Sequence, residues 1–426
     1  MATVFTDSKV PFSLDPYHVS AELGFVLQAP QQELPEFYQP WMDIALRISD
    51  LVQSHMLRSS IDKMPLLSTE YLETHRDLRL AHLALSAMTM GYVWQEGEDG
   101  TIEMLPQNLA VPLWEVSRGS GLPPILTHAD AVLANWRKKD PDGNLELLVT
   151  LPGGDSARGF FMVTLLVELA AVPALRSIPT VINGVRRGDG EAVAGALEVI
   201  QQSLQDMTHA LKLMHVYVEP SIFYGIMRIY LSGWKDNPSM PKGLVYKGVQ
   251  TEPMHYSGGS AAQSSLLHCF DQLLGVQHEA TSGKMVHLGH FLHRMRDYMP
   301  PAHRRLIQDI SREPSLREFV QGERASNARL SRAFTLCVAQ LVALRSDHIN
   351  MVSRFISIPA GRARQLRSRG RTAGETEAIS MAPVALEERG TGGSGIMTFL
   401  KTVRDRTGDA CLPGSSEALQ EQGGQL

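Results

Sequence analysis

Residues 328–359 read ARLSRAFTLCVAQLVALRSDHINMVSRFISIP, and this stretch predicts a long helix. Apolar side chains recur along it at the 3.6-residue period, which gives the helix one oily face. A single histidine, His348, falls on that face among these neighbours: Leu341, Leu344, Met351, Val352 and Phe355. Such a face needs other helices to cover it, so the stretch indicates a helical core.

The imidazole of His348 needs a partner inside the protein, because its neighbours leave no water for its two nitrogens. Two partners are open from the residues alone. One is a hydrogen-bonding group of the core, which is the more common fate of a histidine on such a face. The other is a metal ion or haem iron.

Helical periodicity also dominates the rest of the C-terminal two thirds. Helices are predicted over 159–172, 190–217, 220–233, 261–275, 283–298, 301–311 and 326–356. Strand signals are rare after residue 152, so the predicted fold class is mainly α, with a large all-α domain. Long helices around one interior are a common way to build a cofactor pocket.

The N-terminal part alternates proline-rich connections with amphipathic helices. One helix is predicted over 36–57. Thr74 and Asp77 have the spacing of a capping box, which predicts the start of a second helix. This part of the chain therefore reads as mostly helical too.

A domain boundary is predicted at the stretch SRGSGLPP, residues 117–124, because its glycines and prolines interrupt any helix. We expect a small N-terminal domain at 1–122 and a large domain at 123–426. Early in the large domain, DPDGNLELLVTLPGG (140–154) has a turn followed by alternating residues, which predicts a short hairpin.

The composition is that of a soluble globular protein, with 43% hydrophobic residues, 20% charged residues and a net charge of -5. It gives no sign of a nucleic-acid-binding surface. The N-terminus lacks a secretory signal, and the oily run at 160–173 is interrupted by Glu168 and too short to span a bilayer. Three widely spaced cysteines fit a reducing compartment. We expect a cytoplasmic protein without membrane insertion.

Residues 360–389 differ from the rest of the chain, because a run of five arginines is followed by acidic and small residues without an apolar period. They predict a mobile surface loop. A nuclear-localisation or nucleic-acid patch is the sharper alternative. It is disfavoured because the chain is acidic overall and no aromatic residues are interleaved.

Three further motifs are weak. The run GTGGSG (390–395) matches a dinucleotide fingerprint, but no βαβ unit surrounds it, and a flexible lid fits better. Tyr246, in LVYKGV, fits a short tyrosine-phosphorylation motif that arises often by chance. Histidine recurs at every third position at His287, His290 and His293. This spacing could hold a metal, but no further ligand completes the set.

The stronger candidates for a ligand site lie far apart in the chain. Phe160, Phe161 and Thr164 fall within about one helical turn and offer two aromatic walls and a hydroxyl. Arg228 lies in a mainly apolar helix near Phe223, where a guanidinium must find an anion. That anion is an internal carboxylate or the carboxylate of a ligand, and the residues alone favour the internal salt bridge.

Small residues precede a predicted helix at Gly258, Gly259 and Ser260. Residues of this size let a planar ligand approach the backbone closely. They equally well serve only to cap the helix that follows.

At these residues the chain resembles the indoleamine 2,3-dioxygenase family, and within it the low-affinity second branch or the lower-vertebrate forms. The resemblance runs from LPEFYQPWMDIA (34–45) to GTGGSGIMTFLKTVRDRT (390–407). Between them, RIYLSGWKDNP (228–238), GGSAAQSS (258–265) and MRDYMPPAHR (295–304) occur in the family's order and spacing.

The resemblance implies that the large domain binds haem b with His348 as the ligand of the iron. It implies that the substrate pocket is formed by Phe160, Phe161, Thr164, Phe223, Arg228, His128, Val132, Ser260, Ala261 and Thr391. It also implies that the haem is contacted by Gly259 and Ser260 in the loop and, near its propionates, by Asp271 and Arg345.

The reaction implied by the resemblance is the opening of the indole 2,3-bond of L-tryptophan by dioxygen, which gives N-formylkynurenine. An electron donor would keep the haem ferrous, and the protein would act as a monomer. No acid or base from the protein is expected to take part, because the pocket candidates are apolar or hydroxylic.

The chain departs from the better-known enzyme of the family at His128 and Ala131, where that enzyme has tyrosine and cysteine, while Val132 is kept. Thr164 replaces a serine. These changes predict low affinity for tryptophan. Two competing functions remain on the same scaffold: a signalling protein that recruits partners through Tyr246, and a haem sensor without turnover.

Overall fold

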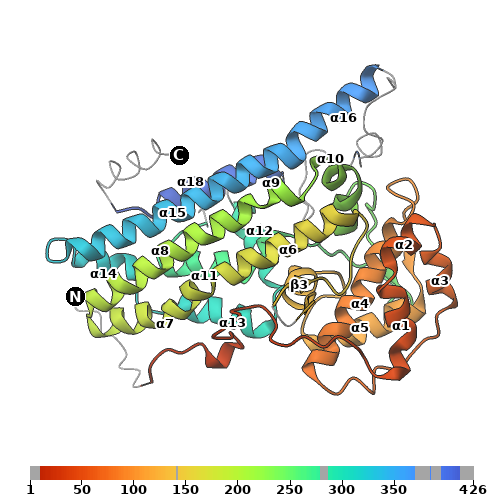
Figure 1. The fold of residues 1–426 in the computed structure, drawn as a ribbon, viewed down its shortest axis with the longest axis horizontal. Helices are drawn as coiled ribbons and strands as arrows, with labels where there is room; N and C mark the ends of the chain where they lie inside the picture. Colours follow the sequence, from red (N-terminus) through yellow and green to blue (C-terminus); the bar gives the residue numbers. More distant parts are fainter. Residues whose placement is uncertain (1–9, 141–142, 279–285, 370–383, 385–394, 413–426) are drawn as a thin grey trace.

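The computed structural model describes residues 10–140, 143–278, 286–369, 384 and 395–412. Long helices dominate it, which confirms the mainly α prediction. Figure 1 shows α15 (Ala328–Val352), α8 (Gly190–Lys212) and the pair α6 (Gly154–Ala170) and α7 (Val172–Arg187) side by side. The stretch that carries His348 is thus a central helix of the molecule.

Helix α7 was missed by the sequence analysis, which predicted no helix between 172 and 190. This stretch contains Pro173 and Pro179, and proline is a helix breaker at most positions. The structure places Pro173 in the first turn of α7, where no helical hydrogen bond needs its N–H, and keeps Pro179 inside the helix. Together α6 and α7 span Gly154–Arg187, long and apolar enough to cross a membrane, but 56% of the most apolar window is buried in the fold.

The described residues of the N-terminal part form five α-helices. They are α1 (Gln39–Ala45), α2 (Ile48–Gln53), α3 (Leu57–Lys63), α4 (His75–Trp94) and α5 (Gln107–Ser120). The single helix predicted over 36–57 is wrong in this respect, because the chain leaves the helical conformation at Arg47. The break lets Trp41 and Ile48 both become fully buried.

Helix α4 begins at the predicted capping box. The Thr74 hydroxyl accepts a hydrogen bond from the backbone N–H of Asp77, and the Asp77 carboxylate accepts one from the backbone N–H of Thr74. These contacts satisfy two N–H groups that a helix start would otherwise leave unpaired.

We expect Thr74→Ala to lower the free energy of unfolding by about 1 kcal/mol, because one of these N–H groups loses its acceptor. Urea denaturation followed by circular dichroism measures the effect. Thr74→Ser is the matched control, since it keeps the hydroxyl and should keep the stability. Equal losses in the two variants would show that the methyl group matters and the cap does not.

Strands are short and few in the described part of the chain. β2 (Arg137–Lys138) and β3 (Leu145–Glu146) pair antiparallel, which confirms the predicted hairpin. β1 (Met104–Leu105) pairs in parallel with β4 (Val245–Tyr246), so it joins the N-terminal part to the middle of the chain.

The remaining helices surround the central ones. They are α9 (Met214–Tyr217), α10 (Pro220–Ile222), α11 (Ser265–Leu274), α12 (Val286–Arg296), α13 (Pro301–Ile310), α14 (Leu316–Gly322), α16 (Ile358–Arg369) and α18 (Ile396–Gly408). Short 3₁₀ turns lie at η1 (Asp15–Tyr17), η2 (Glu36–Tyr38), η5 (Arg228–Leu231) and η6 (Ala261–Gln263).

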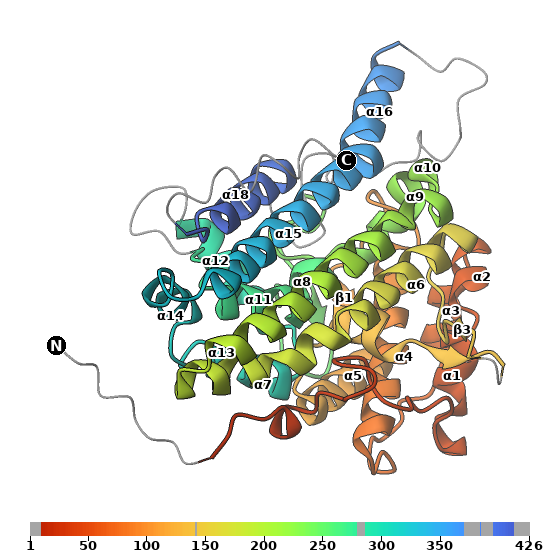
Figure 2. The ribbon, with the colours of Figure 1, turned by 60° about the vertical axis from the view of Figure 1, so that its left-hand side comes forward.

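Helix α16 corrects the loop predicted at 360–389. Its residues continue the line of α15 to Arg369, and Figure 2 shows α16 extending away from the body of the molecule. Alanine, arginine, glutamine and leucine are good helix formers, which explains why a segment without an apolar period is helical here. Residues 370–383 and 385–389 of the predicted loop lie outside the described residues.

One hydrophobic core cluster runs from Phe12 to Leu412 and includes side chains from both sides of residue 122. The chain before the first helices also packs on the C-terminal part. The Tyr17 hydroxyl donates to the Asp309 carboxylate at 2.9 Å, and Asn183 exchanges hydrogen bonds with the Phe12 backbone. The division at 122/123 stays a prediction.

Candidate active site

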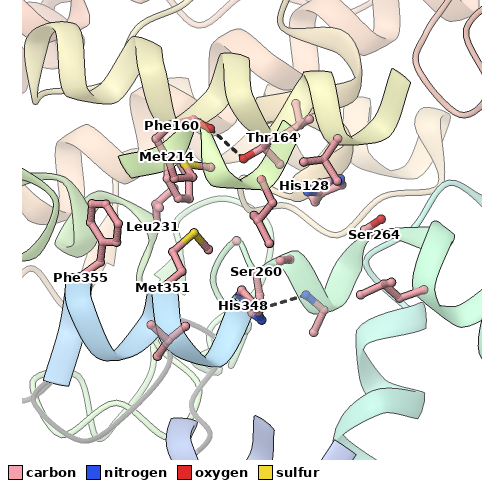
Figure 3. A pocket seen from close by; sticks show the side chains of 18 of the residues that line it. His128, Phe160, Thr164, Met214, Leu231, Ser260, Ser264, His348, Met351 and Phe355 are labelled. Carbon is pink, nitrogen blue, oxygen red and sulfur yellow. Dashed lines mark hydrogen bonds between the residues drawn. The ribbon is translucent and has the colours of Figure 1, made fainter. Parts of the chain in front are cut away.

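A large apolar cavity lies between α6, the end of α8 and α15 (Figure 3). The space among its lining side chains, counted together with the solvent at its open mouth, is about 1750 Å³. Of the residues predicted for the site, the cavity is lined by His128, Val132, Phe160, Phe161, Thr164, Phe223, Arg228, Gly259, Ser260, Ala261, Arg345 and His348. Asp271 does not line it, and Thr391 lies outside the described residues.

Three π-helical segments supply parts of the cavity wall. They are η3 (Ala129–Ala134), η4 (Phe223–Met227) and η8 (Ser353–Ser357), and they carry Val132, Phe223 and Phe355 into the lining. A π-turn adds one residue to a helical turn and is frequent at functional sites. The sequence analysis did not predict these segments.

The His348 ring faces the cavity from α15, on the wall opposite α6 (Figure 3). Among the residues that the structure describes, none forms a hydrogen bond with this ring. Burial, and then the nearby charge of Arg345, lowers the pKa of His348 to about 4. The ring is therefore neutral at neutral pH and keeps a lone pair available for a metal.

One helical turn before His348, Arg345 forms a buried network. Its guanidinium donates to both oxygens of Asp271 at 2.8 Å and to the hydroxyl of Thr407 on α18. Asp271 also pairs with His278 at 2.7 Å. Burial alone would raise the pKa of Asp271, but Arg345 and His278 outweigh it and hold the pKa far below its usual range. The network fixes α15 against α11 and α18.

Aromatic rings form the wall opposite His348. The Phe160 ring centroid lies 5.3 Å from that of Phe161 and 5.1 Å from that of Phe223. Phe223 in turn meets Phe355 edge-on at 6.0 Å. The Thr164 hydroxyl donates to the Phe160 carbonyl at 2.7 Å, so this hydroxyl is engaged by its own helix (Figure 3). Such walls suit a flat aromatic ligand.

Arg228 lies at the start of η5 and is only 1% exposed. Its guanidinium stacks over the Tyr224 ring, 5.6 Å from the ring centroid. Burial lowers the pKa of Arg228 to about 10, and the Tyr224 hydroxyl opposes this shift. At this pKa the guanidinium is charged at neutral pH, which gives the cavity wall a cation suited to a carboxylate.

The glycine loop packs tightly beneath the cavity. A Cβ on Gly258 would meet the Leu231 carbonyl oxygen at 2.0 Å and the Gly233 nitrogen at 2.3 Å, so only glycine fits there. At Gly259, by contrast, the nearest atom would be the Leu126 carbonyl oxygen at 3.6 Å. Gly258 therefore allows close packing of the backbone. Gly259 lines the cavity and takes up no side-chain space there.

The protein-family model described as indoleamine 2,3-dioxygenase matches residues 13–410. The chain belongs to this family. It is 49% identical to indoleamine 2,3-dioxygenase 2 of Homo sapiens, over 95% of this chain and 96% of that protein. It is 44% identical to indoleamine 2,3-dioxygenase 1 of Rattus norvegicus, over 94% of this chain and 96% of that protein. A protein named myoglobin from Haliotis diversicolor is 37% identical, over 92% of this chain and 97% of that protein.

Proteins of the indoleamine 2,3-dioxygenase family are haem-dependent dioxygenases, and this cavity fits the cofactor. It is wide and apolar, as a porphyrin face requires, and it presents one imidazole that no described residue engages by a hydrogen bond. Both observations bear on the question left open at His348, whose role as the iron ligand stays a prediction. A metal ligand fits the ring better than a hydrogen-bonded core histidine does.

Two polar residues in the cavity region of this family member were not predicted from the sequence. The carboxylate of Glu168 accepts a hydrogen bond from His128 Nε2 at 2.8 Å and one from the Ser264 hydroxyl at 2.6 Å. Gln263 accepts from the His128 backbone N–H at 3.0 Å. The signal for Glu168 was visible, because it is the one acidic residue in the oily run at 160–173.

A second buried network holds the wall segment that carries His128. The Asp130 carboxylate accepts from the Thr127 backbone and hydroxyl and pairs with His82 Nδ1 at 2.8 Å, and Arg79 donates to the Ala129 carbonyl at 2.6 Å. Burial alone would raise the pKa of Asp130, but His82 and Arg79 outweigh it and lower the pKa. Helix α4 thus positions one cavity wall.

Two of the three weak motifs, Tyr246 and the histidine group, lie largely within the described residues of this dioxygenase-family chain. Tyr246 is fully buried, and its hydroxyl donates to the Pro124 carbonyl at 2.6 Å, so a partner cannot reach it in the folded protein. His290 and His293 are exposed, and no group of three possible metal ligands occurs among the described residues. Residues 390–394 of GTGGSG, like the side chain of His287, lie outside the description.

Proposed function

We propose that the chain is a haem-dependent dioxygenase that opens the indole 2,3-bond of L-tryptophan with dioxygen to give N-formylkynurenine. One observation carries this proposal beyond family membership. The cavity presents the His348 imidazole on one wall, the Phe160 ring on the opposite wall with the Phe223 ring in contact with it, and a buried guanidinium at Arg228. A haem ligand, an aromatic seat and a carboxylate anchor are thus combined in one space.

The cofactor supplies the dioxygen chemistry when it is bound, and His348 is the residue that would hold its iron. The chain's own contribution is to bind and orient the substrate. Phe160 and Phe223 would contact the indole faces, and Arg228 would hold the carboxylate through paired N–H donors. The apolar lining would exclude water and fix the indole in a reactive position.

No side chain needs to act as an acid or base in this scheme. Two titratable groups of the cavity lining, His128 and Glu168, are bonded to each other. Their pairing suits a role in shaping the pocket. We further propose that the protein is a cytoplasmic monomer without membrane insertion, and that a separate electron donor keeps its haem ferrous.

The test is N-formylkynurenine production by the purified, haem-loaded and reduced protein over a wide range of L-tryptophan concentrations. Product formation supports the proposal. Dioxygen binding without product at any concentration would favour an oxygen-binding or sensing role, which the relative named myoglobin brings into view. The signalling alternative through Tyr246 is not favoured, because that side chain is buried.

We propose that affinity for L-tryptophan is low, and we expect the double variant His128→Tyr, Thr164→Ser to lower the Michaelis constant by about 10- to 200-fold. Removing the Thr164 methyl group and placing an aromatic ring at position 128 would change the free energy of apolar contact with the substrate by roughly 1 to 3 kcal/mol. Steady-state kinetics on both proteins decide. Equal Michaelis constants would show that these two positions do not set the affinity.

A further inference from the structure

The back wall of the cavity carries a polar group that the proposed reaction does not use. His128 is 5% exposed and Glu168 is 3% exposed, and both line the cavity. The lining of the same cavity also includes these apolar residues: Leu126, Ala131, Val132, Leu266 and Leu267. Polar groups buried at such a place cost free energy unless a partner satisfies them.

His128 is held through both its ring and its backbone. Its Nε2 is bound by the Glu168 carboxylate at 2.8 Å, and its backbone N–H is bound by the Gln263 amide oxygen at 3.0 Å. Gln263 itself donates to the Gly258 carbonyl at 2.9 Å, which ties it to the glycine loop. The imidazole is thus held in place before any ligand arrives.

The other ring nitrogen, Nδ1, forms no hydrogen bond with the residues that the structure describes. Since Nε2–H donates to the carboxylate, Nδ1 is an acceptor in the neutral ring and a donor in the charged ring. A hydroxyl group can serve either state, because it both donates and accepts. A plain benzene ring serves neither.

Glu168 is a second buried group in this wall with an acceptor atom that lacks a hydrogen-bond donor in the described part of the chain. Its Oε1 accepts two hydrogen bonds, whereas its Oε2 is buried and has no hydrogen-bond partner among the described residues. A ligand hydroxyl that donates to His128 Nδ1 would polarise the ring and strengthen the bond from Nε2–H to this carboxylate.

We infer that His128 is a specificity-determining residue, and that its Nδ1 forms a subsite for a hydroxyl group on the benzene ring of the indole substrate. This inference rests on the proposed function. If Arg228 binds the carboxylate and His348 holds the haem, the benzene ring of the substrate is the part left to meet a third wall. Figure 3 shows His128 and Ser264 at the end of the cavity away from Phe355.

The test compares substrates within one enzyme preparation, so that differences in folding or haem content cancel. With the haem-loaded protein, kcat/KM is measured for L-tryptophan and for its hydroxy and methyl derivatives at each benzene-ring carbon. At one carbon, hydroxyl should exceed methyl by about tenfold, the worth of one good hydrogen bond in a water-excluded site. Methyl matches hydroxyl in size and lacks its hydrogen bonds.

Two variants assign the effect. His128→Phe keeps a flat ring without nitrogens, and the ratio of hydroxyl to methyl should fall to about one. Glu168→Gln keeps an acceptor for Nε2–H, and the ratio should persist. The inference is overturned if the wild-type protein shows no hydroxyl advantage at any carbon, or if His128→Phe retains the advantage.

Failure of the proposed function is distinguishable from failure of this inference. If no derivative is turned over, the reaction assignment is wrong, while binding still decides the subsite. Dissociation constants from the change in the haem absorption spectrum then replace kcat/KM. The same tenfold preference for hydroxyl over methyl, lost in His128→Phe, supports the subsite, and equal constants contradict it.

Discussion

The variant His348→Ala is expected to lose haem almost completely while it keeps its fold. The imidazole is the protein's bond to the iron in this proposal, so its removal leaves the cofactor without a protein ligand to its metal. The folded chain should tolerate the change, because no described residue forms a hydrogen bond with the His348 ring. Haem absorbance per mole of protein measures the first effect, and circular dichroism measures the second.

Met351→Ala is the matched control for this prediction. Met351 follows His348 by about one turn of α15 and lines the same cavity, but a haem ligated by His348 would not need its side chain. We expect this variant to retain haem. Free imidazole should restore binding to His348→Ala by occupying the space of the lost ring. If His348→Ala keeps haem with an unchanged axial-ligand spectrum, another residue holds the iron.

The second large effect is expected at Arg228. Replacing it with alanine should reduce kcat/KM for L-tryptophan by roughly 30- to 1000-fold, which corresponds to about 2 to 4 kcal/mol of lost charge-assisted hydrogen bonding. Turnover of an indole analogue without the carboxylate, such as tryptamine, should barely respond. The comparison of the two substrates isolates the contact between guanidinium and carboxylate.

Arg228→Lys refines the result. Lysine keeps the charge but lacks the planar fork, so it should recover only part of the lost kcat/KM. Arg228 also stacks on the Tyr224 ring, a contact that contributes to the stability of the fold. A loss of thermal stability in Arg228→Ala, with equal losses on both substrates, would assign Arg228 to the fold and remove it from substrate binding.

Local patterns predicted the elements that are decided by neighbours in sequence. The apolar period around His348 gave α15, and the spacing of Thr74 and Asp77 gave the start of α4. The sequence alone does not predict α7, because Pro173 indicates a helix break unless its place in the first turn is known. The break at Arg47 could not be predicted from the sequence either, because burial of the flanking helices against α4 decides it.

The polar contacts at the site could not be predicted, because they join distant parts of the chain. Glu168 meets His128 across 40 positions, and Gln263 meets the same residue across 135. Periodicity places each residue on a face of its own element but does not say which faces meet. The family resemblance named the lining residues, and it passed over these two because they act through His128.

The three π-helical segments make the cavity depend on residue count as well as on residue identity. Each segment holds one more residue per turn than an α-helix, so a single deletion within η3, η4 or η8 would return the turn to α-helical winding. The turn would then complete 360° with one residue fewer, so side chains within it would change direction while those beyond it would keep theirs. Val132, Phe223 or Phe355 would leave the lining with its chemistry unchanged. Insertions and deletions in these turns are therefore a harsher constraint on this enzyme's divergence than most substitutions in its walls.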